Sequence, residues 1–497
     1  MKVLRTKSVE QSLDDTEDVE FKLKKGLTAL DLTVFGIGVV IGAGIFTLTG
    51  KVASQYAGPG VVFSFLLAAI CCALAALCYA EFASTVPVAG SAYTFSYATL
   101  GEMIAWIIGW DLILELMLGA SVVAQGWSTY LVTFLDEIGI TWPSSVGPAD
   151  SADFHWGHFN LAAVLLVVVL TTLIAIGIKE SLRVNLALVA VKLFIVFFVI
   201  IAGLFYVSGA NYHPFIPPAA DPIDSSGLTQ PLMQVIFGIE PQTFGVLGII
   251  SAASVVFFAY IGFDVVATTA EEANNPQKDL PKGILGSLAI CTVLYMAVAL
   301  VITGMVPYDK IDPDAALATA FTSIGKDGFA TMIAAGAVAG LTTVVMTLLI
   351  GAVRVLFAMS RDGLLPVAFA HTNPKTGTPV RITLTIGAVV AVIAGFTPID
   401  KLEEMVNIGT LTAFLLVSLA VPILRRTRPD LERPFKVPFS PYLPILAALV
   451  CFYLMLNLTV ETWLRFLVWM VIGFAIYYGY GQRHSRVGIA EKEKTAA

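Results

Sequence analysis

Two kinds of residue in this sequence could support chemistry inside apolar surroundings: closely spaced glycines and a few isolated charges. The glycines are Gly36, Gly38, Gly42 and Gly44, all within the segment Asp31 to Phe46. Each glycine costs an uninterrupted helix roughly 1 kcal/mol relative to alanine. The spacing therefore predicts a break in the helix near Gly42-Ala43-Gly44. Free N–H groups at such a break attract a carboxylate.

A second break is predicted further along the chain. The segment reads Phe258-Ala259-Tyr260-Ile261-Gly262-Phe263-Asp264, which places a glycine and then a carboxylate inside an apolar stretch. Asp264 either caps the helix that restarts after Gly262 or contacts a substrate. The sequence leaves both roles open.

Three further charges stand inside apolar runs, where a charge is expensive and indicates a functional site. Lys192 lies about 13 Å deep at 1.5 Å per residue. Asp111 and Glu115 are four residues apart and therefore share one helical face. Glu115 and Lys192 either form a structural ion pair or handle protons. We predict proton coupling through Lys192, with Glu115 and Asp111 as the next candidates.

The glycine run has two other interpretations. A dinucleotide-binding fingerprint would require a preceding strand and a soluble βαβ unit, which the surrounding apolar sequence excludes. Small residues four apart also let membrane helices pack closely, and this structural role for Gly38 and Gly42 stays open.

The elements that hold these residues must cross a bilayer. The chain has 497 residues, of which 57% are hydrophobic and 13% charged, and its mean hydropathy is +0.84. Soluble domains carry about 25% charged residues. A membrane helix needs about 20 mostly apolar residues, and that criterion predicts about twelve. The runs do not alternate as the strands of a membrane barrel would, so the predicted fold class is an all-α polytopic membrane protein.

The loops predict the orientation of the chain. Loops 128–159 and 209–246 contain no Lys or Arg, whereas the connections on the other side are rich in both. By the positive-inside rule we expect both termini in the cytoplasm. The N-terminal tail is predicted over residues 1–25, the twelve-helix domain over 26–482 and the C-terminal tail over 483–497.

The two breaks fall in predicted spans one and six. Interrupted helices at corresponding positions of two halves indicate a transporter built from inverted repeats, with the substrate bound at the breaks. The first repeat is expected at about 31–208, the second at about 247–424, and two extra helices at about 441–481. Glu81, Asp31 and Arg354 lie near the ends of spans, where a solvated or interfacial position is expected.

Composition and motifs exclude several classes of protein. The net charge is -7, so no basic surface indicates nucleic acid. The five cysteines form no metal-ligand pattern and are expected to be small buried hydrophobes. Nucleotide-binding, zinc-protease and serine-hydrolase motifs are missing. We therefore predict no enzyme, no metal and no cofactor, and an ion or substrate gradient as the energy source.

Several segments resemble one family. They are Gly42-Ala43-Gly44-Ile45-Phe46, Tyr79-Ala80-Glu81-Phe82-Ala83, Phe258 to Asp264 with Glu271-Glu272 and Asn275-Pro276-Gln277, and Ser360-Arg361-Asp362-Gly363. The sequence is similar to the cationic amino acid transporter family of the amino acid-polyamine-organocation superfamily, and with about twelve spans it resembles the bacterial members.

The resemblance implies the LeuT-type fold of five plus five helices, with helices one and six broken. It also implies that backbone N–H groups of Gly42, Ala43, Gly44 and Ile45 bind the carboxylate of an amino acid, while carbonyls of Phe258, Ala259 and Ile261 bind its ammonium. Proton-coupled relatives carry a lysine at the position of Lys192, where sodium-coupled ones bind an ion. Leu348 of the eighth span would border the substrate side chain, the alternative being a core or lipid-facing leucine.

The sequence as a whole predicts a plasma-membrane transporter that imports amino acids by proton symport without sodium. Small neutral L-amino acids such as alanine, and cationic ones, are the expected substrates. The alternative is an exchanger or uniporter of arginine and lysine, and a receptor or channel is disfavoured. The lipid bilayer is an expected partner, a small single-span accessory subunit is another, and a monomer is the expected state.

Overall fold

The structure is a computed structural model that describes residues 5, 26–86, 91–148, 159–177, 182–220, 227–239, 242–373 and 377–490. The predicted N-terminal tail lies outside the described residues except for Arg5, and so do residues 491–497 of the predicted C-terminal tail.

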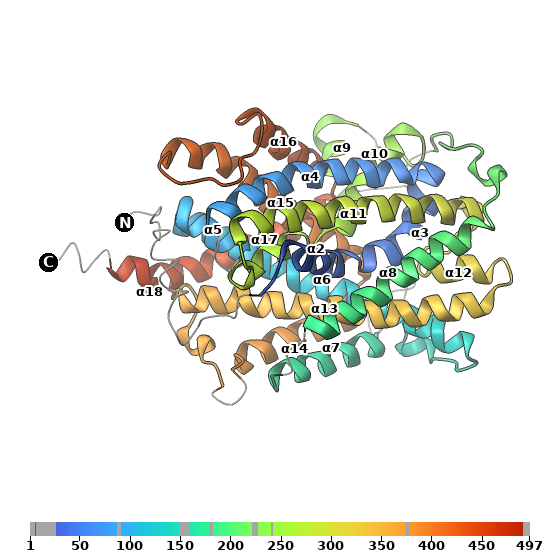
Figure 1. The fold of residues 1–497 in the computed structure, drawn as a ribbon, viewed down its shortest axis with the longest axis horizontal. Coiled ribbons are helices and arrows are strands. Elements are labelled where there is room, and N and C mark those ends of the chain that lie inside the picture. The colour runs from blue at the N-terminus through green and yellow to red at the C-terminus, as the bar shows by residue number, and fades with distance from the viewer. Residues whose placement is uncertain are drawn as a thin grey trace.

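The described residues form a bundle of long helices that run along a common direction (Figure 1). By length and composition, eight helices are apolar and long enough to cross a membrane, and four shorter apolar helices accompany them. Within the described ranges there are no strands, only three isolated β-bridges. The predicted fold class is confirmed.

The first span consists of α2 (Ala29–Val40), η1 (Gly44–Leu48), α3 (Thr49–Val52) and η2 (Ala53–Ala57). The next four are α4 (Val61–Thr85), α6 (Glu102–Glu137), α7 (Leu161–Ala175) and α8 (Leu182–Leu204). The sixth span consists of α10 (Gly245–Val256), η7 (Phe257–Tyr260) and η8 (Asp264–Glu272). The remaining spans are α11 (Pro276–Met305), α13 (Asp327–Arg361), α14 (Val380–Phe396), α15 (Ile399–Thr427), α16 (Tyr442–Leu456) and α17 (Val460–Ile476).

Shorter helices lie outside the spans or extend them. They are α5 (Ser91–Thr99), α9 (Leu232–Phe237), α12 (Ala316–Thr322), η11 (Tyr477–Gly481) and α18 (Gln482–His484). Short 3-10 turns complete the connections: η3 (Gly58–Gly60), η4 (Ser144–Val146), η5 (Gly209–Tyr212), η6 (Gly227–Thr229), η9 (Tyr308–Lys310) and η10 (Val367–Ala370).

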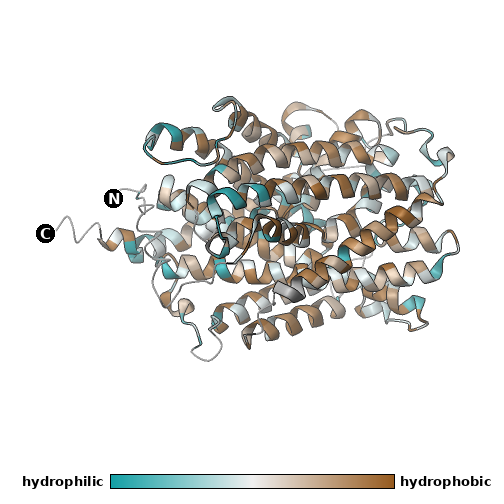
Figure 2. Cartoon of the chain, viewed as in Figure 1, coloured by the Kyte–Doolittle hydropathy of each residue, from teal (hydrophilic) through white to brown (hydrophobic). Residues whose placement is uncertain are grey.

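Hydrophobic residues predominate along the helices (Figure 2), and many large apolar side chains are exposed on the outside of the bundle, as expected for helices that face lipid. Exposed examples on three outer helices are Leu165, Val168 and Val169 of α7, Phe194, Phe197 and Ile201 of α8, and Leu467, Val468 and Val471 of α17. Such a surface is unfavourable in water. Apolar side chains therefore lie both in the interior and on the surface of the bundle, which indicates that a bilayer surrounds it.

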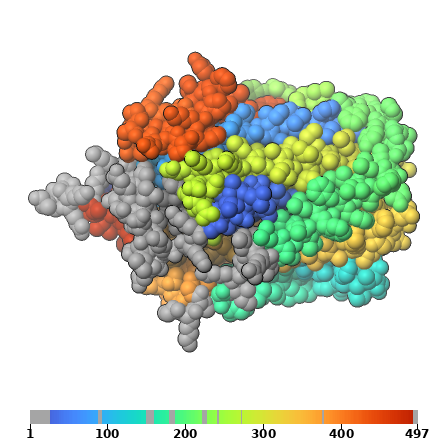
Figure 3. Space-filling view, viewed as in Figure 1, coloured from blue at the N-terminus to red at the C-terminus, as the bar shows by residue number. Residues whose placement is uncertain are grey.

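Helix α6 lies in the interior of the bundle, since 94% of its most apolar segment is buried. It packs against α13, α15 and α14. On the face shown in Figure 3, α2 lies between α11 and α8. The part of the first span that precedes the break is therefore held by two helices that come from different predicted repeats.

Two helices extend beyond their apolar runs into more polar sequence. Helix α6 continues to Glu137, and α11 begins at Pro276 and includes Pro281. Proline is tolerated at the first helical position, where its missing N–H has no intrahelical partner. A hydropathy criterion cannot detect such polar helix extensions, because they lie beyond the apolar run.

The two ends of the described chain meet at the start of α6. The backbone N–H of Glu102 donates to the carbonyl of Arg5 at 2.7 Å, and the Ser485 hydroxyl donates to the Glu102 carboxylate. In Figure 1, α18 lies at the end of the bundle opposite α12. An even number of spans is required for both ends to lie on the same side.

Candidate functional site

The first span is broken where the glycine spacing predicted. Helix α2 ends at Val40, and Ile41 leaves the helical region with φ -71° and ψ 87°. The chain resumes as the π-helix η1 at Gly44, after Ala43. Segments of π-helix occur frequently at functional sites. Gly42, Ala43, Gly44 and Ile45 are all buried.

The sixth span is also broken as predicted. The 3-10 turn η7 ends at Tyr260, Ile261 is extended with φ -61° and ψ 138°, and Gly262 has φ +112°. A residue with a side chain rarely adopts that backbone conformation. The chain then continues as η8 from Asp264, so this break is fixed by Gly262.

The two breaks are in direct contact. A Cβ atom on Gly44 would lie 2.3 Å from Cα of Ala259, and a Cβ atom on Gly262 would lie 2.7 Å from Cγ1 of Val39. Both distances are far below a van der Waals contact. The absence of a side chain at these glycines is therefore what allows the first span to touch the sixth.

Tyr295 of α11 connects the same two breaks. Its hydroxyl lies 2.6 Å from the carbonyl oxygen of Val40 and 2.9 Å from that of Ala259. Tyr295 is fully buried. The sequence analysis did not identify this residue, because a tyrosine in an apolar helix has no distinctive neighbours in the sequence.

Lys192 is fully buried and lies beside the first break. Its ammonium donates to the carbonyl of Gly38 at 2.6 Å. Its aliphatic stem passes over Gly340 of α13, where a Cβ atom would lie 2.8 Å from Cγ of Lys192. Lys192 therefore connects the end of α2 with α13.

Thr342 and Thr343 follow Gly340 closely in α13. Thr342 accepts a hydrogen bond from the Trp127 indole at 2.9 Å and donates to the carbonyl of Val338. Thr343 donates to the carbonyl of Gly340. These hydroxyls thus serve the helix backbone and the contact between α6 and α13.

The carboxylates of Asp111 and Glu115 are buried in α6. Within the part of the chain that the structure describes, no oxygen of either carboxylate has a hydrogen-bond partner. An ion pair between Glu115 and Lys192 was one of two alternatives, and it is not formed. Glu115 lies instead near Asp264 and beside Thr410 of α15.

Asp264 lies at the start of η8, with backbone N–H groups of Gly262 and Val265 beside its carboxylate. The N-cap position of η8 is held by Phe263, and no side-chain hydrogen bond caps this helix. The Oδ1 atom of Asp264 has no hydrogen-bond partner in the described ranges. Asp264, Asp111 and Glu115 are all buried, and Glu115 lies near both of the other carboxylates.

Leu348 is buried in α13, with its Cδ1 atom 3.5 Å from the position of a Cβ atom on Gly119 of α6. The lipid-facing alternative for this residue is therefore excluded.

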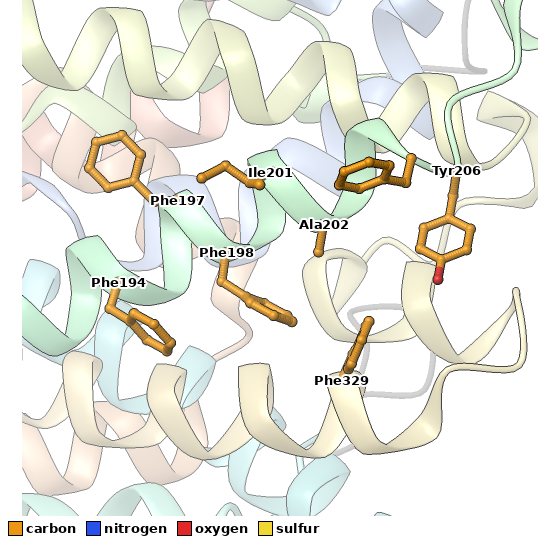
Figure 4. A pocket seen from close by; sticks show the side chains of 8 residues that line it. Phe194, Phe197, Phe198, Ile201, Ala202, Tyr206 and Phe329 are labelled. Atoms are coloured by element: carbon orange, nitrogen blue, oxygen red, sulfur yellow. The ribbon is translucent and has the colours of Figure 1, made fainter.

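An apolar groove of about 440 Å³ lies elsewhere, between α8 and α13 (Figure 4). Its walls include Phe194, Phe197, Phe198, Ile201, Tyr206 and Phe329. Phe194 and Ile201 are each 58% exposed, so the groove opens on the lipid-facing surface and is separate from the breaks. No group of three or more His, Cys, Asp or Glu among the described residues could hold a metal ion.

Comparison with known proteins identifies the family. The family model described as "Amino acid permease" matches residues 27–478. This chain belongs to the amino acid permease family. It is therefore a multi-pass membrane transporter and not an enzyme.

Three relatives of the permease illustrate its range of similarity. The branched-chain amino acid permease BcaP of Bacillus subtilis is 46% identical over 98% of this chain and 99% of its own length. The methylthioribose transporter of the same organism is 44% identical over 93% of this chain and 95% of its own length. Cationic amino acid transporter 4, vacuolar, of Arabidopsis thaliana is 31% identical over 97% of this chain and 96% of its own length. The resemblance to cationic amino acid transporters is thus confirmed at the level of family.

Proposed function

We propose that this permease imports neutral L-amino acids such as alanine across the plasma membrane by proton symport. The observation that carries the proposal is the direct contact of the two broken spans at Gly44 and Ala259. Two interrupted helices that meet inside a membrane bundle provide opposite helix ends at one place, and transporters bind substrates and ions at such ends.

The two ends are complementary to a zwitterion. The N-terminal end of η1, at Ala43 to Ile45, carries the positive end of a helix dipole and free N–H groups, so it binds the substrate carboxylate. Carbonyls at Phe258, Ala259 and Ile261 bind the ammonium. Phe258 already accepts from the N–H of Ile261 at 3.1 Å, and each carbonyl oxygen has a second lone pair for the substrate.

The contact between Gly44 and Ala259 leaves no room for a ligand between these two residues. Substrate entry therefore requires the first span to move away from the sixth. Such a movement is what alternating access demands of a fixed central site.

The side chain of the substrate extends toward α13 in this proposal. Leu348 of α13 borders that side chain in this proposal. Leu348 packs against Gly119 of α6. Relatives are named for branched-chain and for cationic amino acids. We assign neutral aliphatic substrates to this chain and treat cationic ones, exchanged or carried without a proton, as the alternative.

The proton acts through Lys192 in this proposal. The protonated ammonium donates to the Gly38 carbonyl and holds the end of α2. Loss of the proton removes the charge from this hydrogen bond, and charge-assisted bonds are about twice as strong as neutral ones. The end of α2 is then released, which supplies the two-state element that coupling needs.

Uptake into proteoliposomes tests this function. We expect wild-type protein to accumulate labelled alanine faster under an inward proton gradient, with no requirement for sodium. Lys192→Met should lose the acceleration, whereas Lys278→Met, which removes an exposed lysine of α11, should keep it. A full response to the gradient in Lys192→Met would transfer the coupling role to Glu115 and Asp111. Uptake in wild type that depends only on amino acid inside the vesicles would favour the exchanger.

A further inference from the structure

We propose that Tyr295 is a positioning residue of the substrate site, which fixes the carbonyls that bind the ammonium and links them to the end of α2. The proposal rests on the proposed function, because it assumes that an amino acid binds at the two breaks. It starts from the hydroxyl of Tyr295, which lies within hydrogen-bond distance of one carbonyl from each broken span.

A single hydroxyl proton lies between two backbone oxygens. The distances are 2.6 Å to Val40 and 2.9 Å to Ala259, both within the usual range for a hydroxyl donor. Two carbonyl oxygens that converge on one point repel each other unless a donor stands between them. The hydroxyl therefore holds the end of α2 and the second break at a fixed separation.

The ring of Tyr295 is itself held firmly. It lies 5.3 Å from the ring of Tyr260 and 5.6 Å from the ring of Phe65. The Tyr260 hydroxyl donates in turn to the carbonyl of Phe65 at 3.0 Å. Aromatic pairs at these distances are favourable, so the hydroxyl of Tyr295 has little freedom to follow a moving carbonyl.

Two side chains from different helices thus bind the last turn of α2. Tyr295 of α11 donates to Val40, and Lys192 of α8 donates to Gly38, two residues earlier. The last carbonyls of a helix have no intrahelical partner and need such donors. Tyr295 also contacts the Ala259 carbonyl. A substrate that binds this carbonyl therefore acts, through Tyr295, on the same end of α2 that Lys192 holds.

Replacing Tyr295 with phenylalanine removes the hydroxyl and keeps the ring. We expect Tyr295→Phe to weaken competition by L-alanine against labelled alanine about tenfold, because the ammonium loses a positioned carbonyl. L-Lactate has a hydroxyl in place of the ammonium, and its neutral hydrogen bond to the carbonyls is weaker than a charge-assisted one, so its competition should change much less. The inhibition constant of lactate divided by that of alanine should therefore fall several-fold.

A second tyrosine that hydrogen-bonds α11 provides a matched control. Tyr212 of η5 donates its hydroxyl at 2.7 Å to the carbonyl of Leu300 in α11, which belongs to neither broken span. Tyr212→Phe removes an equivalent bond and should leave the ratio unchanged. Equal weakening of alanine and lactate in Tyr295→Phe would leave the ratio unchanged and show a structural role only. That result would overturn the proposal, as would no weakening of either competitor.

Two further outcomes keep the test decisive. If wild-type protein does not prefer alanine to lactate, the proposed function itself fails, whatever Tyr295 does. If Tyr295→Phe does not fold, 3-fluorotyrosine at position 295 of otherwise wild-type protein serves instead. Saturating alanine should then shift the fluorine resonance and lactate should not, and the absence of a shift with alanine would overturn the proposal.

Discussion

Gly44 and Gly262 allow the two broken spans to touch because neither residue has a side chain. Each is placed where a Cβ atom would overlap the other span, at 2.3 Å for Gly44 and 2.7 Å for Gly262. At the residue scale, the site therefore depends on backbone groups, and the side chains around it act by holding that backbone.

Gly44→Ala tests this dependence with the smallest possible side chain. The added methyl group must displace Ala259, and a shift of about 1 Å in a binding geometry can cost roughly 100-fold in rate. We expect alanine uptake to fall by about that factor. Gly328→Ala in α13, where no atom lies within 4 Å of the new group, should transport like wild type. Normal uptake by Gly44→Ala would show that the glycines serve helix packing only.

The sequence predicted individual residues unevenly. Lys192 was identified from its position deep in an apolar run, where a lysine needs a nearby acceptor, and the structure shows the Gly38 carbonyl as one such acceptor. Glu81 was expected near solvent but is 1% exposed and receives two hydrogen bonds from Arg425, at 2.9 and 2.6 Å. Its partner lies 344 residues away in the chain. Tyr295 was missed for the same reason, since its acceptors come from two distant segments.

At the scale of elements, the part of the first span that follows the break is connected to the tenth span by ion pairs. Lys51 of α3 forms ion pairs with Asp400 and Glu403 of α15, the latter at 2.8 Å. The side chain of Lys51 is 18% exposed and that of Glu403 only 7%. Breaking a buried pair leaves an uncompensated charge, so this network makes the position of α3 sensitive to a single substitution.

Lys51→Met should destabilise the protein by about 3 kcal/mol, at the low end of the range for buried pairs because Asp400 is partly exposed. The melting temperature in detergent should fall by several degrees. The double variant Lys51→Met with Glu403→Gln removes one of the stranded charges and should recover part of the loss. An unchanged melting temperature in Lys51→Met would show that the ion pairs add nothing to stability.

At the scale of the whole molecule, hydropathy and glycine spacing were sufficient to predict a twelve-helix bundle with breaks in spans one and six. Apolar runs report the part of a helix inside the bilayer, so the polar ends of α6 and α11 were not predicted. The division into two repeats and the sides of the membrane stay predictions. They rest on the pattern of breaks and on loops without Lys or Arg.

Labelling from one side tests that orientation. All five native cysteines are buried, which leaves single introduced cysteines as the reactive sites. Ser144→Cys and Arg486→Cys place thiols at exposed positions. In intact cells an impermeant reagent should label the first and not the second. Equal labelling of both would contradict the predicted topology.

Competition for uptake by wild-type protein tests the central claim, that the two breaks bind the charged ends of an amino acid. A relative that is 44% identical is named as a methylthioribose transporter. Methylthioribose has neither an ammonium nor a carboxylate. L-Lactate lacks the ammonium, and alaninamide lacks the carboxylate. We predict that L-alanine inhibits the uptake of labelled alanine at least about tenfold more strongly than any of these three. Inhibition by methylthioribose as strong as that by alanine would contradict the account.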